Sequence, residues 1–124
     1  MIIIQNGKIK EVGTNLKISK TDKIIDLSNS WVLPGLMDCH VHITANETYR
    51  NLTPEQEYAT ESTVFRAIRG TVVAKEFLDN GFTTIKEIGN DANYATADII
   101  KAIKKGWIQG PTIIYAGKII APYV

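Results

Sequence analysis

The chain has 124 residues, about the size of one ordinary domain, and it is 44% hydrophobic and 22% charged, as folded globular proteins are. Its fourteen lysines and arginines nearly balance thirteen aspartates and glutamates, which leaves no basic excess for nucleic acid and no polybasic patch for a membrane. A single cysteine excludes an internal disulfide, and we expect a cytoplasmic protein.

The first 35 residues have the pattern of short β-strands. Asn6-Gly7 separates two stretches rich in isoleucine, which is a strong signal for a two-residue hairpin turn. Further strands are expected at residues 24–27 and 31–33, where short apolar runs flank a cluster of turn residues. The sequence therefore predicts an all-β unit over residues 1–35.

After residue 35 the pattern alternates between strands and helices. Thr53 followed by Pro54 and Gln56 is a helix start, and apolar residues recur beyond it at helical spacing until Asn80-Gly81. The expected elements are a strand at 36–43, a helix at 54–79, a strand at 82–88, a helix at about 96–105 and a strand at 111–116. This order predicts parallel strands joined by right-handed crossovers.

Both histidines of the chain lie in the segment Asp38-Cys39-His40-Val41-His42. Because side chains alternate along a strand, Asp38, His40 and His42 are expected on one face and Cys39 on the other. Two imidazoles placed in this way can share one divalent ion such as zinc, iron, nickel or copper, with Asp38 orienting a ring. The alternative is that the two histidines are a chance surface pair, since the spacing alone is a weak signal.

The sequence around these histidines resembles the amidohydrolase superfamily. The string W-V-L-P-G-L-M-D-C-H-V-H-I (residues 31–43) is similar to the first barrel strand of that superfamily, with its P-G-x-x-D-x-H-x-H signature. The string D-N-G-F-T-T-I-K-E-I-G (79–89) is similar to its second strand. Residues 100–117 resemble the following helix and third strand of the branch that includes imidazolonepropionase-like enzymes and Xaa-Pro dipeptidases.

The resemblance implies an α/β fold that is part of a TIM (β/α)8 barrel. Residues 36–124 would supply the first three strands and two helices of a metal-dependent hydrolase barrel, and residues 1–35 would form part of a small β-sandwich domain. It further implies that His40 and His42 bind a divalent metal, which we expect to be zinc, in a centre of one or two ions. The implied reaction is hydrolysis of an amide, peptide or cyclic amide C–N bond in a small-molecule or dipeptide-like substrate by a metal-activated water.

The chain is too short for the whole family site. The bridging ligand, the later histidines and the general-base aspartate of the family would lie beyond residue 124, so we expect the 124-residue chain alone to be inactive and to be an N-terminal portion of an enzyme. The alternative is a non-catalytic, truncated α/β remnant. In either case we expect self-association or pairing with the missing barrel segment, because three strands do not close a barrel.

Other residues near the predicted strand ends are also site candidates. Glu87 ends the second strand and Lys118 follows the third, so both are candidates for the rim of the site, although residues at such positions are more often ion-paired rim groups without a functional role. Cys39 is expected to be a buried, inert thiol. Trp31 and Trp107 are expected to be core or interface anchors.

Overall fold

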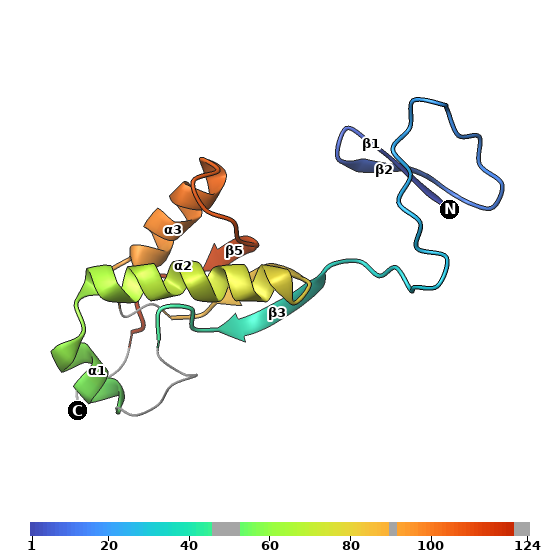
Figure 1. The fold of residues 1–124 in the computed structure, drawn as a ribbon. Coiled ribbons are helices and arrows are strands. Elements are labelled where there is room, and N and C mark those ends of the chain that lie inside the picture. Colours follow the sequence, from blue (N-terminus) through green and yellow to red (C-terminus); the bar gives the residue numbers. More distant parts are fainter. Residues whose placement is uncertain (46–52, 90–91, 121–124) are drawn as a thin grey trace. The chain divides into compact units, whose positions relative to one another are not determined.

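A computed structural model of the chain describes residues 1–45, 53–89 and 92–120 (Figure 1). The chain divides into two compact units, Met1–Leu33 and Pro34–Val124. Within the described ranges, no helix has the length and apolar character that crossing a bilayer requires.

The first unit contains one antiparallel hairpin. Strand β1 (Ile2–Gln5) pairs with β2 (Lys8–Val12), and Gln5 lies opposite Lys8 at the turn. The two central residues, Asn6 and Gly7, have φ angles of 53° and 71°. Positive φ at both positions is the requirement of a type I′ turn, which asparagine and glycine meet most readily. The predicted hairpin is therefore confirmed.

The strands predicted at residues 24–27 and 31–33 are wrong, because both segments are irregular. Asp26 instead makes a local turn, in which its Oδ1 accepts the backbone N–H of Ser28 at 2.9 Å, and Ser30 N–H donates to the Leu27 carbonyl at 2.9 Å. An extended segment needs a partner strand to satisfy its backbone groups, and the described residues provide none here. The apolar side chains of these segments are exposed.

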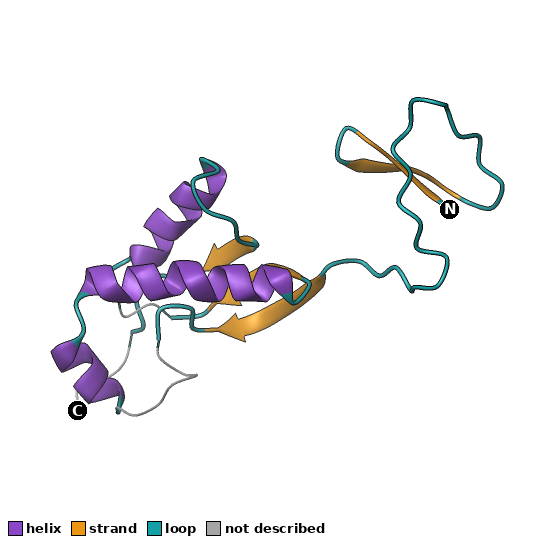
Figure 2. Cartoon of the chain, in the orientation of Figure 1, coloured by secondary structure: helices purple, strands orange, loops and turns teal. Residues whose placement is uncertain are grey.

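The second unit is a parallel sheet with helices (Figure 2). Its strands are β3 (Leu36–Val41), β4 (Phe82–Glu87) and β5 (Thr112–Tyr115), and both neighbouring pairs are parallel in the order β3-β4-β5. The helices are α1 (Pro54–Thr60), α2 (Thr63–Asp79) and α3 (Ala95–Lys104). The predicted parallel α/β arrangement is confirmed.

The helix predicted at 54–79 is two helices instead of one. It begins as expected, because Thr53 Oγ1 accepts the N–H of Gln56 at 3.3 Å and the Gln56 side chain returns to Thr53 N–H at 2.9 Å. Ser62 then starts a new helix, since its hydroxyl accepts the N–H of Phe65 at 3.2 Å and its backbone is extended. A serine hydroxyl competes with the helical ladder in this way, which explains the break.

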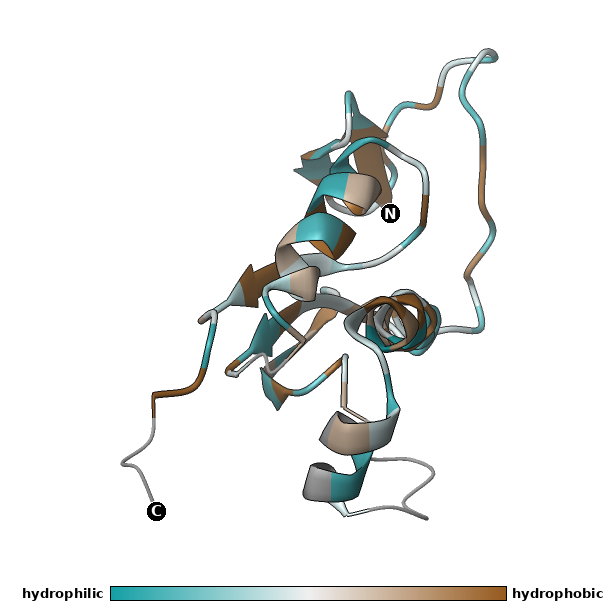
Figure 3. Cartoon of the chain, turned by 90° about the vertical axis from the view of Figure 1, so that its left-hand side faces the viewer, coloured by the Kyte–Doolittle hydropathy of each residue, from teal (hydrophilic) through white to brown (hydrophobic). Residues whose placement is uncertain are grey.

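The core lies between the sheet and helices α2 and α3. Both helices pack on the same side of the sheet (Figure 3), and the buried side chains are Val41, Ile43, Ala74, Ile85, Ile99 and Ile113. Gly70 allows α2 to pack closely against α3 and the turn after β3. A Cβ at this position would lie 2.6 Å from Cδ1 of Ile99 on α3 and 3.3 Å from Cγ2 of Thr44 in the turn. The glycine therefore brings α2 against the turn that follows β3.

The side of the sheet opposite the helices is exposed and carries both polar and apolar side chains, since Lys86 lies beside Ile114 there. On β5, Ile113 is buried whereas its neighbour Ile114, which alternates to the other side, is 55% exposed. Parallel sheets are normally covered on both faces, whereas the described helices cover only one face of this sheet.

The interpretation of Trp31 and Trp107 as core residues is wrong. Trp31 is 96% exposed and Trp107 is 74% exposed. Trp107 follows the turn that ends α3, and its ring centroid lies 4.9 Å from the ammonium of Lys105 instead of among apolar side chains. Their role as interface anchors stays a prediction.

We predict that the purified 124-residue chain will associate with itself. The exposed face of the sheet and the edges of β3 and β5, which pair with no further strand among the described residues, favour contacts between chains. Multi-angle light scattering is expected to give a molar mass greater than that of one 124-residue chain at all accessible protein concentrations. A monodisperse monomer that unfolds cooperatively would contradict the prediction.

Candidate functional site

The candidate site lies at the carboxyl-terminal edge of the parallel sheet. His40 is on β3 and His42 is the first residue after that strand, Glu87 is the last residue of β4, and Lys118 follows β5. In parallel α/β structures, this edge is where the loops gather and where ligands bind. Three strands therefore each deliver a polar residue to one edge.

The two histidine rings are close neighbours. Their centroids are 5.3 Å apart and their planes meet at 84°. Strand β3 is shorter than predicted: it ends at Val41 instead of Ile43, and the N–H of Ala45 returns to the His42 carbonyl in a turn. His40 is exposed, and the side chain of His42 is 25% exposed.

The pairing of β3 with β4 is irregular next to the histidines. Asp38 lies opposite Ile85 and Val41 lies opposite Glu87, so three steps along β3 match two along β4. A bulge of this kind interrupts the simple alternation of side chains that the sequence-based prediction assumed. Asp38 uses its Oδ1 to accept the backbone N–H of His40 at 3.0 Å, so its observed contact is with the main chain.

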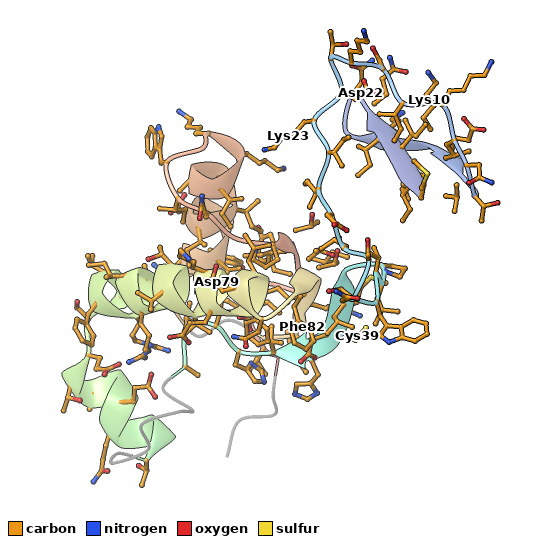
Figure 4. All side chains as sticks on the ribbon, turned by 45° about the vertical axis from the view of Figure 1, so that its right-hand side comes forward. Lys10, Asp22, Lys23, Cys39, Asp79 and Phe82 are labelled. Carbon is orange, nitrogen blue, oxygen red and sulfur yellow. The ribbon has the colours of Figure 1, made fainter. Side chains whose placement is uncertain are left out.

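Cys39 is exposed, and the prediction of a buried thiol is wrong (Figure 4). Strand β3 is an edge strand, whereas α2 packs over β4 and α3 over β5. A side chain in the middle of β3 that points away from the site therefore has no helix above it in the part of the chain that the structure describes. Val41, two residues further along β3, is buried in the core cluster.

Glu87 is completely buried and contacts the residues that follow β3. Its Oε2 accepts the backbone N–H of Ile43 at 2.7 Å, and its Oε1 lies 3.3 Å from Nδ1 of His42. Burial raises the pKa of the Glu87 carboxyl above its ordinary value, against the opposing effects of the Ile43 N–H and of His42. The structure thus places this residue beside a histidine instead of on an open rim.

The Nδ1 atom of His42 has a second neighbour in the main chain. The Gly89 carbonyl lies 3.2 Å away and is aligned for a hydrogen bond, whereas Glu87 Oε1 is within ion-pair distance without that alignment. Gly89 lies close to the segment after β5, because a Cβ there would lie 2.4 Å from Cγ1 of Ile119. The segment after β4 therefore passes close to both His42 and the chain that follows β5.

Lys118 is not brought to the histidines. Its ammonium lies over the ring of Tyr94, 5.2 Å from the ring centroid, and among the described residues it has no hydrogen bond or ion pair with His40, His42 or Glu87. Tyr94 itself adopts a left-handed backbone conformation with φ of 67° at the start of α3. The observed contact therefore connects Lys118 to the loop before α3.

The sequence analysis did not predict a buried ionic cluster around Arg69 of α2. Arg69 of α2 donates to both carboxylate oxygens of Glu61, at 2.9 and 2.7 Å, and to the Thr44 carbonyl at 2.7 Å, and it pairs with Glu57. The spacing of Glu57 and Glu61, one helical turn apart before two arginines three residues apart, was the available signal. The cluster holds the turn after β3 against α1 and α2.

The described residues offer few candidate ligands for a metal ion. No group of three or more His, Cys, Asp or Glu side chains among residues 1–45, 53–89 and 92–120 is arranged to hold a metal ion. The two imidazoles form the only donor pair that combines histidine chemistry with proximity in those ranges. Any metal held here would take its further ligands from elsewhere.

A comparison with known families decides the relationship. The model of the Amidohydrolase family matches residues 31–122, which is most of the chain and includes both histidines. The chain belongs to the amidohydrolase family. The resemblance inferred from the sequence is thereby confirmed, and the described site lies inside the matched segment of this amidohydrolase.

Individual relatives are consistent with the family. The chain is 26% identical over 123 residues to 5′-deoxyadenosine deaminase of Methanobrevibacter smithii, which covers 87% of this chain and 26% of the relative. A solved Xaa-Pro dipeptidase with bound methionine in its active site is 31% identical, with a TM-score of 0.53 over 71% of this chain and 20% of that one. Molinate hydrolase, at 24% identity, shares the fold, with a TM-score of 0.78 over 96% of this chain and 26% of that one. The chain spans about a quarter of the length of these proteins.

We predict that Arg69→Ala will lower the free energy of unfolding by about 3 kcal/mol, because it removes a guanidinium that pairs with two largely buried carboxylates. Urea denaturation followed by circular dichroism measures this change. Lys75→Ala is the matched control, since Lys75 also pairs with an acid on α2 but in an exposed position, and it is expected to change the value by less than about 0.5 kcal/mol. Equal effects of the two substitutions would contradict the structural role of the cluster.

Proposed function

We propose that this chain carries the first metal-binding segment of a hydrolase that cleaves a C–N bond with a metal-activated water. The observation that carries the proposal is the pair His40 and His42 at the carboxyl-terminal edge of a parallel sheet, within a segment of the amidohydrolase family. Relatives named as a deaminase and as a dipeptidase support chemistry at C–N bonds.

The donor set fits a divalent metal in part. Two imidazoles on one tetrahedral zinc, each about 2.0–2.1 Å from the ion, would have ring centroids roughly 5 Å apart. The observed separation of 5.3 Å is close to this value. Imidazole nitrogen is a common zinc ligand, so zinc is the metal that we propose, with His40 and His42 as ligands and the remaining ligands supplied outside the described residues.

The residues near the metal would have separate roles. When bound, the metal would lower the pKa of a water to roughly 7 and polarise the scissile carbonyl. His40 and His42 would hold the ion, and Asp38 would support the His40 backbone through its hydrogen bond to the His40 N–H. No residue among those described is assigned as the general base, so we propose that the 124-residue chain alone lacks hydrolase activity.

The proposed architecture is the beginning of a TIM barrel. Three parallel strands with crossover helices on one side match the first part of such a barrel, and the opposite, exposed side would face its interior. The β-hairpin unit before it would belong to a small β-sandwich domain. The alternative function, a non-catalytic α/β chain that associates through its exposed sheet face, is favoured by the exposure of Ile114.

We predict that the chain binds zinc weakly and that either His40→Ala or His42→Ala abolishes the binding. Two protein ligands are fewer than the three that catalytic zinc sites use, so the affinity is expected to fall well below that of a complete site. Isothermal titration calorimetry with ZnCl₂ on metal-free protein measures both effects.

Cys39→Ser is the matched control for this titration. Cys39 is an exposed thiol beside His40, and thiolates bind zinc strongly, so it is the residue most able to mislead the experiment. Its substitution is expected to leave zinc binding unchanged. Loss of binding in Cys39→Ser together with retention in both histidine variants would show that the ligands were chosen wrongly, and would favour the non-catalytic alternative.

A further inference from the structure

Glu87 has no assigned part in the metal site, yet it is the only charged side chain in contact with His42 among the described residues. It sits at the end of β4 with no exposed surface, and its carboxylate faces the ring of His42, the first residue after β3. A carboxylate is costly to bury, so its position calls for partners that use both oxygens. One oxygen has the Ile43 N–H, and the other lies against the His42 ring.

We propose that Glu87 is a positioning residue that holds His42 in the tautomer with its proton on Nδ1, leaving Nε2 as the nitrogen that binds a metal. The metal-binding half of this inference rests on the function proposed above, whereas the tautomer half concerns the protein alone. Metal-binding histidines commonly have their other ring nitrogen fixed by a carboxylate or a backbone carbonyl.

The surroundings of Nδ1 favour a proton on that atom. Two oxygens face it, the Gly89 carbonyl at 3.2 Å and Glu87 Oε1 at 3.3 Å. A carbonyl accepts hydrogen bonds and cannot donate them, and an ionised carboxylate has the same restriction. With two acceptors and no donor facing it, Nδ1 is favoured as the N–H nitrogen of the neutral ring.

Glu87 also fixes where the ring lies. Its Oε2 accepts the Ile43 N–H at 2.7 Å, and Ile43 is itself completely buried. The carboxylate therefore connects the end of β4 to the backbone next to His42, while its other oxygen and the Gly89 carbonyl lie against Nδ1 of the ring. Loss of the carboxylate charge would affect the ring without removing side-chain volume.

His40 provides an internal contrast. Its ring is exposed, and its observed contact is with the edge of the His42 ring, with no hydrogen bond to either ring nitrogen in the described part of the chain. We therefore expect a mixture of tautomers at His40 and one dominant tautomer at His42. The chain has only these two histidines, so each can be observed by itself in a single-site variant.

The test is ¹⁵N NMR of the full chain labelled at histidine, metal-free, at about pH 8, where an ordinary imidazole is neutral. In His40→Ala, whose only ring is that of His42, we expect a protonated-type shift at Nδ1 and an unprotonated-type shift at Nε2. A proton found mainly on Nε2 would overturn the inference. This measurement requires no change at Glu87.

Glu87→Gln tests the residue itself. The amide introduced by this substitution keeps an acceptor for the Ile43 N–H but presents a donor to Nδ1, so the His42 proton is expected to move toward Nε2. Zinc affinity is then expected to fall about 10–100-fold, the usual effect of losing such a supporting partner. Glu76→Gln, at an exposed position on α2, is the matched control and is expected to change neither the shifts nor the affinity.

The two measurements separate this inference from the proposed function. If His42 has its proton on Nδ1 and Glu87→Gln moves it, while the unaltered chain binds no zinc, the positioning role stands and the proposed function fails. If the unaltered chain and Glu87→Gln have the same tautomer and bind zinc equally well, the positioning role is overturned and the proposed function stands.

Discussion

The hydrogen bond from the Ile43 N–H to the carboxylate of Glu87 is the contact on which the candidate site depends. Because β3 ends at Val41, the backbone of Ile43 leaves the sheet while it is still buried. A buried N–H without an acceptor would cost about 1–3 kcal/mol. Glu87 removes that cost and, with the same carboxylate, reaches the ring of His42. One buried charge therefore sets both the end of the strand and the place of the imidazole.

Thr44, the residue after Ile43, is held by the positively charged side chain of Arg69. The Thr44 carbonyl accepts a hydrogen bond from Arg69 of α2, and Gly70 beside it lets that helix come close to the turn. The Glu87 carboxylate thus accepts the N–H of Ile43, and the Arg69 guanidinium donates to the carbonyl of Thr44, the next residue. The turn that carries His42 is anchored to β4 and α2 at once, so its position follows from the packing of the whole second unit.

The sequence was most informative where a local rule determines the structure. Asn6-Gly7 predicted the hairpin and Thr53 predicted the helix start, since turn and cap chemistry act within a few residues. Sequence-based prediction failed where the structure depends on partners distant in the chain. Residues 24–27 have strand character, but no strand lies beside them among the described residues. Cys39 is exposed because no described helix covers it. The contact between Glu87 and His42 joins two different strands, and only the register of those parallel strands brings them together. The histidine pair itself was visible because both residues lie in one short segment.

The exposure of the two tryptophans gives each unit its own optical reporter. Trp31 belongs to Met1–Leu33 and Trp107 to Pro34–Val124, and these are the only indoles of the chain. Both rings are largely in water, so their emission starts near the red limit and can only move to shorter wavelength when a surface is covered. Replacing one indole at a time would therefore report which unit becomes covered when the chain meets a further polypeptide.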